Sequence, residues 1–421
     1  MAVNSVIVKI WGLDVGYLSW DEQNDKAVFS YTEDFPAKGL NIAPLEKSID
    51  SPSVRLPLSG NSDKLYMGLP RFIADSLPDR WGNKVFEAWA SRNNIPKRKL
   101  TPIDRLSFIG SRGMGALEYQ PSFMKNEEAV PIAAAELAKT ALDIQADRRQ
   151  VLARMNDDSL LEDIYRVGTS AGGKRAKAII AMNEDGDIRS GQVSLPDEYK
   201  YYILKFNDAE WFPFPEVEMA YYRMACEAGI DMMPSRLMTI ENKRHFLTER
   251  FDRQEGKKLH LLTLAAMADY ADSYEDLFAV MRLLRLPKAQ HQQMFRRMVF
   301  NVLGGNVDDH TKNFSFLMTD KGLWSITPAY DMLFSIDVDA PDYANRHAMS
   351  VCGKKDNITH DDLLQFAKMN DIRQPEQIIL QVKEALVHWD CFAMDACVPA
   401  KWQTIINEYI QENVRQSCPG G

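Results

Sequence analysis

The chain lacks most marks of a secreted, membrane-bound or zinc-binding protein. Its five cysteines, at positions 226, 352, 391, 397 and 418, form no C-x-x-C pair, so we expect free thiols in a reducing compartment rather than a disulfide framework. The start, Met1–Val6, shows no basic region followed by an apolar core, and no run approaches the roughly 18 apolar residues that a membrane-spanning helix needs. We therefore expect a cytoplasmic protein without membrane contact.

An excess of positive charge is also missing. The 59 acidic residues outnumber the 50 Lys and Arg residues and leave a net charge of −9, so the chain as a whole is not expected to bind nucleic acid by electrostatics. Local basic clusters, such as Lys97–Lys99, are interpreted as solvated faces. No internal repeat is present, and low complexity is confined to residues 417–421. A chain of 421 residues with 45% apolar residues can bury two or three cores.

Three blocks are predicted along the chain. Residues 1–125 are β-rich at first, with strands near 6–11 and 27–31, and then helical from Pro70 to Asn93. Residues 150–255 have the pattern of strands around one helix. The third block, residues 256–421, is predicted to be mainly helical, with helices over 274–284, 288–303, 361–369, 376–389 and 399–414.

The most informative segment is 306–313, Asn-Val-Asp-Asp-His-Thr-Lys-Asn, which is followed by an Asp at position 331. Phosphotransferases of the protein-kinase type carry a base Asp in a catalytic loop, an Asn five positions later and a second Asp after a short hairpin. Phosphoryl transfer needs one carboxylate at the acceptor hydroxyl, while an amide and another carboxylate hold magnesium. We predict Asp308 as the base, and Asn313 and Asp331 as the metal ligands.

A β-hairpin is predicted between the two metal ligands. Two short apolar runs, 314–318 and 323–326, flank the turn Thr319-Asp-Lys-Gly, which would bring residues 313 and 331 near one end of the hairpin. A polar loop that merely follows a helix is the plain alternative. A transition-metal site at Asp-Asp-His is a weaker alternative, because one His with two adjacent carboxylates lacks further close ligands.

A loop of small residues over 167–177 precedes an apolar segment and a turn at Asn183–Asp187, which predicts strand, turn and strand. Such a loop can place backbone N–H groups on phosphates. Gly168, Gly173 and Lys174 fit G-x-x-x-x-G-K, but Arg175 stands where a P-loop has Ser or Thr, and a strand-like segment follows instead of a helix. Alone, a loop of this kind is more often an ordinary hairpin turn.

Lys205 ends the apolar run 201–205 and has the position of a lysine that contacts the α- and β-phosphates. A helix predicted from Glu216, with a stop at Gly229, carries Glu218 in its first turn, where it would pair with Lys205 as strand Lys and helix Glu do in kinases. A solvated Lys and a Glu favoured by the helix dipole are the alternative. The order of the motifs along the chain favours kinase chemistry.

From about residue 55 to the C-terminal helices, the sequence resembles the HipA-like serine/threonine kinases, toxins of bacterial type II toxin–antitoxin modules. The resemblance implies an α+β, protein-kinase-like two-lobed fold, with an N-terminal HipA-type subdomain over 1–125, a kinase N-lobe over 150–255 and a helical C-lobe over 256–421. The segments that carry it are Asp75-Ser-Leu-Pro-Asp-Arg-Trp-Gly, Arg105-Leu-Ser-Phe-Ile-Gly, Gly115-Ala-Leu, the loop around Ser170, Tyr-Ile-Leu-Lys205, Thr248-Glu-Arg-Phe-Asp-Arg253, Asp308-Asp-His-Thr-Lys-Asn-Phe-Ser and Thr327-Pro-Ala-Tyr-Asp331.

The resemblance also implies ATP and Mg²⁺ as cofactors and assigns roles to residues. Lys205 would contact ATP, Glu249–Phe251 would form the hinge that holds adenine, and Ser170 would be the regulatory autophosphorylation site. The implied nucleotide- and metal-binding residues are Gly172, Gly173, Lys174, Lys177, Lys205, Glu249, Arg250, Phe251, His310, Lys312, Asn313, Tyr330 and Asp331.

Partners are implied in the same way: a protein substrate such as an aminoacyl-tRNA synthetase, and a small helix-turn-helix antitoxin of HipB type through which any DNA contact would run. Two departures from the family pattern are visible. The loop from Ser170 to Lys177 is more basic, and the first forty residues match only in their β character. Two other functions stay open, a small-molecule kinase of the aminoglycoside or choline type and a non-catalytic partner of a repressor.

Overall fold

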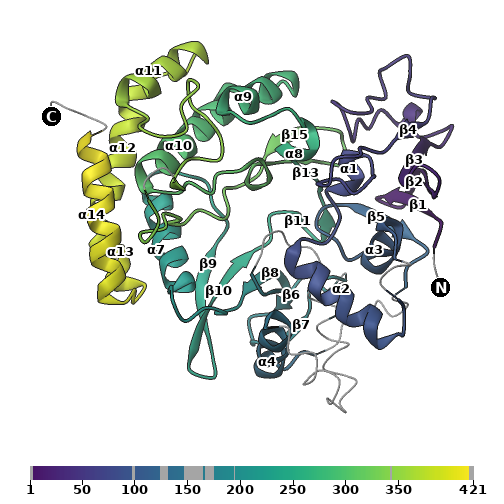
Figure 1. Ribbon diagram of the computed structural model, residues 1–421, viewed down its shortest axis with the longest axis horizontal. Helices are drawn as coiled ribbons and strands as arrows, with labels where there is room; N and C mark the ends of the chain where they lie inside the picture. Colours follow the sequence, from purple (N-terminus) through teal and green to yellow (C-terminus); the bar gives the residue numbers. More distant parts are fainter. Residues whose placement is uncertain are drawn as a thin grey trace. The chain divides into compact units, whose positions relative to one another are not determined.

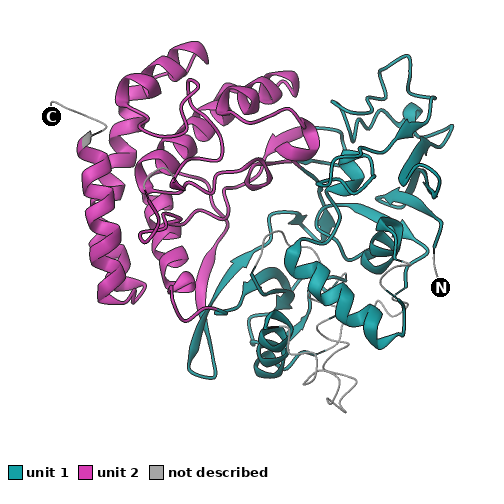
Figure 2. Cartoon of the chain, in the orientation of Figure 1, with its two compact units in different colours: residues 1–208, 238–262, 317–323 teal, residues 209–237, 263–316, 324–421 magenta. Residues whose placement is uncertain are grey.

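The computed structural model describes residues 3–96, 100–123, 131–146, 165, 175–193, 195–341 and 344–416. The chain forms two compact units, which Figure 2 distinguishes by colour: residues 1–208, 238–262 and 317–323 in the first, and 209–237, 263–316 and 324–421 in the second. The division of the chain into three blocks stays a prediction. In the described ranges, no helix is both long and apolar enough to span a bilayer.

The first unit contains an antiparallel five-stranded sheet of order β4-β3-β2-β1-β5 (Figure 1). The predicted strands near 6–11 and 27–31 are confirmed. In the first of them, Val6, Val8 and Ile10 alternate toward the core and are buried, as the two-residue period of a strand requires. The strands are β1 (Ser5–Ile10), β2 (Leu13–Asp21), β3 (Lys26–Tyr31), β4 (Leu58–Ser59) and β5 (Leu117–Gln120).

The helical stretch predicted from Pro70 to Asn93 is interrupted. It forms α1 (Arg71–Ala74) and α2 (Arg80–Arg92), because Pro78 offers no backbone N–H to a continuous helix and the Asp79 side chain accepts from the Gly82 N–H to start a new one. The remaining helices of this part are η1 (Pro36–Lys38), α3 (Pro102–Ile109) and α4 (Ala134–Gln145).

A second five-stranded sheet, of order β7-β6-β8-β10-β9, carries the strand residues of the predicted nucleotide site. The strand, turn and strand predicted after the small-residue loop are confirmed by β6 (Lys177–Met182) and β7 (Ile188–Ser190). Helices α2 and α4 share one hydrophobic core with this sheet, in which Trp81 and Phe86 pack with Ile180 and Leu204. The other strands are β8 (Lys200–Lys205), β9 (Ser235–Ile240) and β10 (Lys243–Glu249), followed by β11 (Arg253–Gln254) and β12 (Lys257–Lys258).

The second unit is mainly helical, as predicted. Helix α10 packs against α12 and α14 (Figure 1). The predicted helix 376–389 ends at Val387, and Trp389 begins a separate helix. The helix that carries Glu218 begins at Phe214, so Glu218 is its fifth residue and not in its first turn. The helices are α7 (Phe214–Glu227), α8 (Leu264–Met267), α9 (Tyr274–Leu283), α10 (Lys288–Gly304), α11 (His360–Met369), α12 (Pro375–Val387), α13 (Trp389–Asp395) and α14 (Ala400–Gln416).

The hairpin predicted between residues 313 and 331 is present. A single 3-10 turn, η3 (Thr311–Asn313), leads into β14 (Ser315–Met318), and β15 (Trp324–Ile326) returns the chain. The turn between these strands closes through hydrogen bonds of the Thr319 and Gly322 N–H groups, and the Thr327 N–H donates to the Ser315 carbonyl at 3.0 Å. Strand β13 (His260–Thr263) immediately precedes α8 in the chain.

Candidate active site

The loop predicted to be catalytic begins where α10 ends. Gly305 has a φ of 69°, and its N–H donates to the Asn301 carbonyl, which is the left-handed helix cap that glycine adopts without strain. A Cβ at Gly305 would lie 2.6 Å from the Tyr409 ring. This glycine therefore fixes the direction in which the loop leaves the helix.

Two side chains hold the first half of the loop. The Ser335 hydroxyl accepts from the N–H groups of Val307 at 2.8 Å and Asp308 at 3.0 Å. The Asn306 side-chain amide donates to Asn301 Oδ1 at 2.9 Å. Because both backbone donors are satisfied from one side, the Asp308 carboxylate is turned outward, and 63% of its side chain is exposed.

Asp309 faces the interior, where it borders a small cavity. Its side chain is completely buried and accepts from the Tyr274 hydroxyl at 2.8 Å, His347 Nδ1 at 2.9 Å and the Ala348 N–H at 2.8 Å. Burial, together with the charge on Asp309, raises the pKa of Tyr274 well above its ordinary value, so this hydroxyl keeps its proton and donates. Of the two neighbouring carboxylates, only Asp308 is exposed to an incoming molecule.

The two predicted metal ligands line the same small cavity. It has a volume of about 20 Å³, and Asn313 and Asp331 are both among the residues around it, which is room for an ion or a water molecule. The Asn313 Nδ2 donates to the Asp308 carbonyl at 2.8 Å, which commits the NH₂ end of the amide and leaves Oδ1 for a cation. In the described parts of the chain, no group of three or more His, Cys, Asp or Glu is placed so that it could hold a metal ion. Mg²⁺ needs no such cluster, because it commonly binds through one or two protein oxygens plus water and phosphate.

Asp331 has a φ of 52°, a left-handed conformation that Asp and Asn tolerate better than most residues. The residue before it is anchored, because the Tyr330 hydroxyl lies 2.5 Å from Ser315 Oγ and donates to the Lys312 carbonyl at 2.9 Å. The Tyr330 ring therefore ties the Asp331 segment to the turn that carries Asn313. His310, whose Nε2 lies 3.8 Å from Asp308 Oδ1, is partly exposed beside the carboxylate.

A buried arginine that the sequence analysis did not select also lines this cavity. Arg297, on α10, is 4% exposed, and its guanidinium donates to the Thr327 carbonyl at 2.8 Å. Its Nε has no hydrogen-bond partner among the described residues. Burial lowers the pKa of Arg297 to about 10, so the side chain is a cation at neutral pH. It places positive charge beside the carboxylates of the cavity.

The strand residues of the predicted nucleotide site lie in the first unit. Lys205 ends β8 opposite Phe246 of β10, and its ammonium lies 5.6 Å from the centre of the Phe246 ring. Lys177, the first residue of β6, is buried, and its ammonium lies 3.3 Å from an Asp79 carboxylate oxygen. Lys177 is therefore paired within the protein. Lys205 is half-buried at the end of its strand.

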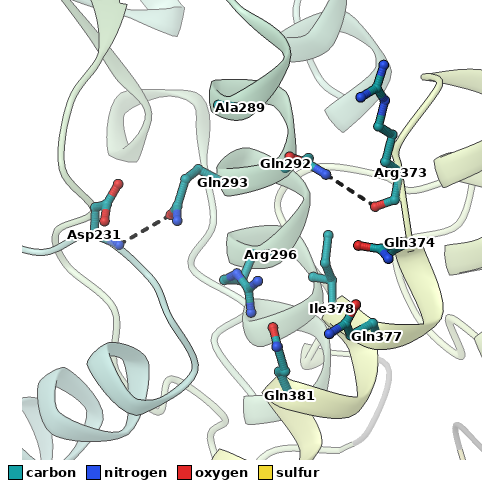
Figure 3. Close-up of a pocket in the computed structure, with 10 residues that line it drawn as sticks. All are labelled: Asp231, Ala289, Gln292, Gln293, Arg296, Arg373, Gln374, Gln377, Ile378 and Gln381. Carbon is teal, nitrogen blue, oxygen red and sulfur yellow. Dashed lines mark hydrogen bonds between the residues drawn. The ribbon is translucent and has the colours of Figure 1, made fainter.

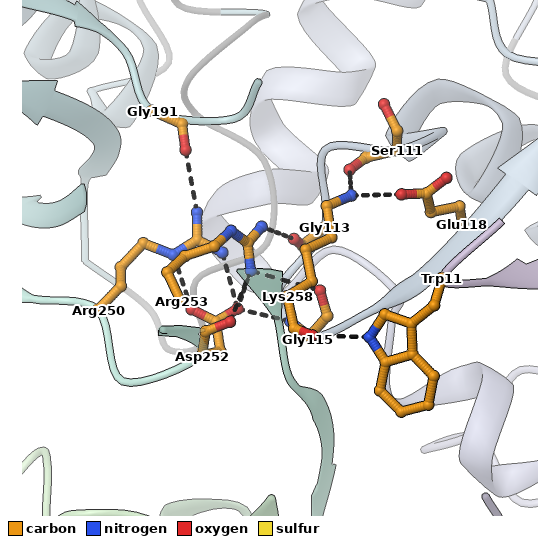
Figure 4. Close-up of polar contacts among 10 residues, drawn as sticks. All are labelled: Trp11, Ser111, Gly113, Gly115, Glu118, Gly191, Arg250, Asp252, Arg253 and Lys258. Atoms are coloured by element: carbon orange, nitrogen blue, oxygen red, sulfur yellow. Dashed lines mark hydrogen bonds and ion pairs between the residues drawn. The ribbon is translucent and has the colours of Figure 1, made fainter. Parts of the chain in front are cut away.

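The predicted hinge continues from β10 into a buried ionic cluster (Figure 4). Arg250 makes two 2.8 Å hydrogen bonds to the two carboxylate oxygens of Asp252 and a third bond, 3.3 Å long, to the Gly191 carbonyl. Arg253 binds the same carboxylate at 2.8 Å, and the Gly115 N–H donates to it at 2.7 Å. Burial alone would raise the pKa of Asp252, but the two guanidinium groups more than offset this and lower it.

Each guanidinium nitrogen of Arg250 is hydrogen-bonded in this cluster, and the side chain is fully buried. We therefore expect any adenine contact by Arg250 to come from its backbone. Glu249, the last residue of β10, accepts from Lys200 Nζ at 3.3 Å. Beyond the hinge, Lys258 donates to Glu118 at 2.6 Å and receives the Trp11 indole N–H on its carbonyl at 2.7 Å (Figure 4). These contacts join the hinge to the N-terminal sheet within the first unit.

Several predicted site residues lie outside the described residues: Ser170, Gly172, Gly173 and Lys174. Glu218 is 5% exposed and belongs to the second unit, whereas Lys205 belongs to the first. Their pairing stays a prediction.

Sequence reasoning missed the residues that support the site. Ser335 and His347 follow Asp331 in a segment with no regular period, and Tyr274 and Arg297 read as ordinary helix residues. The one available signal was the doubled Asp at 308–309, since two adjacent carboxylates cannot both face the same acceptor. No local pattern told which of the two would be buried.

Comparisons with known proteins identify the family to which the chain is similar. The family described as HipA-like C-terminal domain matches residues 169–390, and the HipA N-terminal domain matches residues 6–120. The protein Y4mE of Sinorhizobium fredii, whose name calls it a candidate kinase, is 25% identical over 376 residues, 85% of this chain and 83% of that protein. The serine/threonine-protein kinase toxin HipA of Shewanella oneidensis is 24% identical over 377 residues, 80% of this chain and 76% of that one.

A solved structure shares the fold. The Shewanella oneidensis toxin–antitoxin complex of HipA, HipB and operator DNA contains a chain that superposes with a TM-score of 0.67 at 18% identity, covering 98% of this chain and 96% of that one. The predicted fold class, α+β and protein-kinase-like of the HipA type, is confirmed.

Proposed function

The chain belongs to the HipA family, and from this premise we propose that it is an ATP- and Mg²⁺-dependent serine/threonine protein kinase, the toxin of a HipBA-like toxin–antitoxin system. One observation carries the proposal. An exposed carboxylate, Asp308, stands five residues before Asn313 in a loop fixed from both ends, and Asn313 lines one cavity with Asp331. This is the arrangement that phosphoryl transfer to a hydroxyl requires.

Each residue of the loop has a distinct role in this proposal. Asp308 accepts the proton of the substrate hydroxyl as the hydroxyl oxygen attacks the γ-phosphorus, and the bond from that phosphorus to the bridging oxygen of ADP breaks. Asn313 and Asp331 hold Mg²⁺, which neutralises charge on the phosphates when it is bound. His310, Lys312 and Tyr330 line the phosphate side of the same loop. Asp309 accepts its three hydrogen bonds in the core and keeps the loop in shape.

The nucleotide is bound by residues of the first unit in this proposal. Lys205 contacts the α- and β-phosphates and pairs with Glu218, and the backbone of Glu249–Phe251 receives adenine. Gly172, Gly173 and Lys174 cover the phosphates. Lys177 can join them only by leaving Asp79, with which it is paired at 3.3 Å, so we expect its contribution to be the smallest of the set.

Ser170 is proposed as the autophosphorylation site. A phosphoserine adds about −1.5 to −2 charges at neutral pH, and in a loop that covers the ATP phosphates this charge would repel them. Phosphorylation is therefore expected to inactivate the enzyme.

The proposed partners are a HipB-type helix-turn-helix antitoxin and a protein substrate of the translation apparatus, such as an aminoacyl-tRNA synthetase. The Shewanella oneidensis relative was solved with HipB and operator DNA, which supports the antitoxin. The net charge of −9 supports DNA contact through the antitoxin rather than by this chain.

The experiment that tests the function is incubation of the purified chain with γ-labelled ATP and Mg²⁺, alone and with cell lysate. Labelled serine on the chain and one dominant labelled protein band are expected, with mass spectrometry placing the autolabel at Ser170. Label on small molecules alone would contradict the proposal and indicate a metabolite kinase. Absence of any label would contradict it too and indicate a non-catalytic partner of a repressor.

A further inference from the structure

A polar groove of about 450 Å³ lies in the second unit between the first half of α10 and the start of α12 (Figure 3). It shares no lining residue with the cavity of Asn313 and Asp331. Five of its ten lining residues are glutamines, two are arginines and one is an aspartate, and none is aromatic. The groove offers no aromatic face for stacking a nucleobase, whereas its amides and guanidinium groups suit a ligand rich in carbonyl, amide and carboxylate groups.

The walls of the groove are held in place by their own side chains. The Gln293 amide accepts from the Asp231 N–H at 3.2 Å and donates to the Gly229 carbonyl at 2.8 Å. Gln292 donates to the Arg373 carbonyl at 3.3 Å, which ties the start of α12 to α10 (Figure 3). The groove is thus built before any ligand arrives, and binding does not have to order it.

The α12 wall presents amides that have no partner. Gln377 and Gln381 are spaced four residues apart and therefore lie on one face of the helix. Gln374 is the residue just before the helix begins. Their side chains make no hydrogen bond with any residue that the structure describes, and all three line the groove. Each carries one carbonyl and one NH₂ group, which complement the alternating N–H and carbonyl groups of an extended peptide.

The charge of the groove selects the kind of peptide. Arg296 and Arg373 contribute two positive charges and Asp231 one negative charge. Arg296 is held by its own bond to the Ala228 carbonyl at 2.6 Å, and Arg373 is exposed. The groove therefore favours acidic side chains over basic ones.

The occupant has to be larger than a metabolite. Asp231, Ala289, Arg373, Gln374 and Gln377 are exposed, so the groove is open along one side, whereas small-molecule sites commonly bury about 70–90% of their ligand. An extended segment of a macromolecule can lie across an open groove and keep its other side in solvent. We propose that this groove binds an extended acidic segment of a partner protein. The proposal concerns binding only and stands whether or not the chain transfers phosphate.

The test is fluorescence anisotropy of the whole chain with a labelled pool of peptides that carry Glu at every second position and Ser, Asn or Gly between. A matched pool carries Lys in place of Glu, and inorganic phosphate is the competitor. We expect the Glu pool to bind and the Lys pool not to bind. Arg373→Glu should lower the affinity for the Glu pool about tenfold or more. The double variant Gln377→Ala/Gln381→Ala should lower this affinity as well.

The control is Lys368→Glu, an exposed residue at the end of α11 that makes the same change of charge outside the groove. It should bind the Glu pool as the unchanged chain does, and circular dichroism checks that all variants fold. Equal binding of the two pools, unchanged affinity in Arg373→Glu, or an equal loss in Lys368→Glu would overturn the proposal. Complete displacement by phosphate would do so too, by making the groove a small-anion site.

Discussion

At the residue scale, the two adjacent carboxylates of the loop differ in what surrounds them. Asp308 makes its hydrogen bonds through its backbone, and its carboxylate is exposed beside His310, whereas the Asp309 carboxylate accepts three hydrogen bonds in the core. The spacing to Asn313 selected Asp308 from the sequence, and the burial of Asp309 supports that choice independently. The burial of Asp309 depends on Tyr274 and His347, which lie 35 and 38 residues away in the chain. No local sequence pattern could therefore predict it.

The Asp309→Ala variant should lose stability. It leaves the Tyr274 hydroxyl, the His347 ring and the Ala348 N–H without an acceptor in a buried site, and we expect a loss of about 3 kcal/mol in the free energy of unfolding. Urea denaturation followed by circular dichroism measures it. The Asp308→Ala variant, at an exposed carboxylate, serves as the control and should unfold within about 0.5 kcal/mol of the unchanged chain. Equal stability of both variants would show that the buried network does not hold the loop.

The Asp331→Asn variant should lose Mg²⁺-dependent nucleotide binding. Asn is the appropriate replacement, because the φ of 52° at this position would strain most other residues. Removing the negative charge from a two-ligand site should weaken ATP binding in the presence of Mg²⁺ about tenfold or more and leave binding without Mg²⁺ nearly unchanged. Isothermal titration with and without the metal gives both values, and a loss independent of Mg²⁺ would refute the metal role.

At the scale of elements, the sequence predicted most helices and the hairpin, because their periods and turn residues are local. The sequence predicted α1 and α2 as one helix, because the apolar pattern continues across Pro78 and Asp79. It also predicted α12 and the start of α13 as one helix across His388. It could not place the cluster of Arg250, Asp252 and Arg253, since that cluster needs Gly115 and Gly191, which come from distant strands and loops. Non-local contacts of this kind have no signature in a single sequence.

The hinge cluster should be a main contributor to the stability of the first unit. In Asp252→Asn the buried Arg250 and Arg253 lose their shared counter-charge, which we expect to cost about 3–5 kcal/mol. Because the folded pKa of Asp252 lies below the ordinary value of 3.8, its contribution is present above that pH and is lost as the pH falls below it. Chemical denaturation between pH 2 and pH 7 should show the stability falling below about pH 4 in the unchanged chain and a weaker fall in Asp252→Asn. Identical pH profiles of stability in the unchanged chain and in Asp252→Asn would show that Asp252 does not cause the loss of stability in acid.

At the scale of the whole molecule, the acidic chain and its family membership together predict a complex that binds DNA only through a second protein. Co-expression with a small helix-turn-helix protein encoded beside it should give one peak in size-exclusion chromatography at micromolar concentration. That complex should bind DNA, with an affinity that falls as salt rises, whereas this chain alone should not. Two separate peaks, or DNA binding by this chain alone, would count against the proposed module.

The central claim is that Asp308 is the base of a phosphotransferase, and the rate of phosphate transfer from γ-labelled ATP in Asp308→Ala tests it most directly. The account predicts a fall of about 10² to 10⁴ in rate, with ATP affinity and unfolding free energy close to those of the unchanged chain. Near-normal turnover in Asp308→Ala, with loss of activity in a folded Asp309→Ala, would contradict it and move the catalytic role to the neighbouring carboxylate.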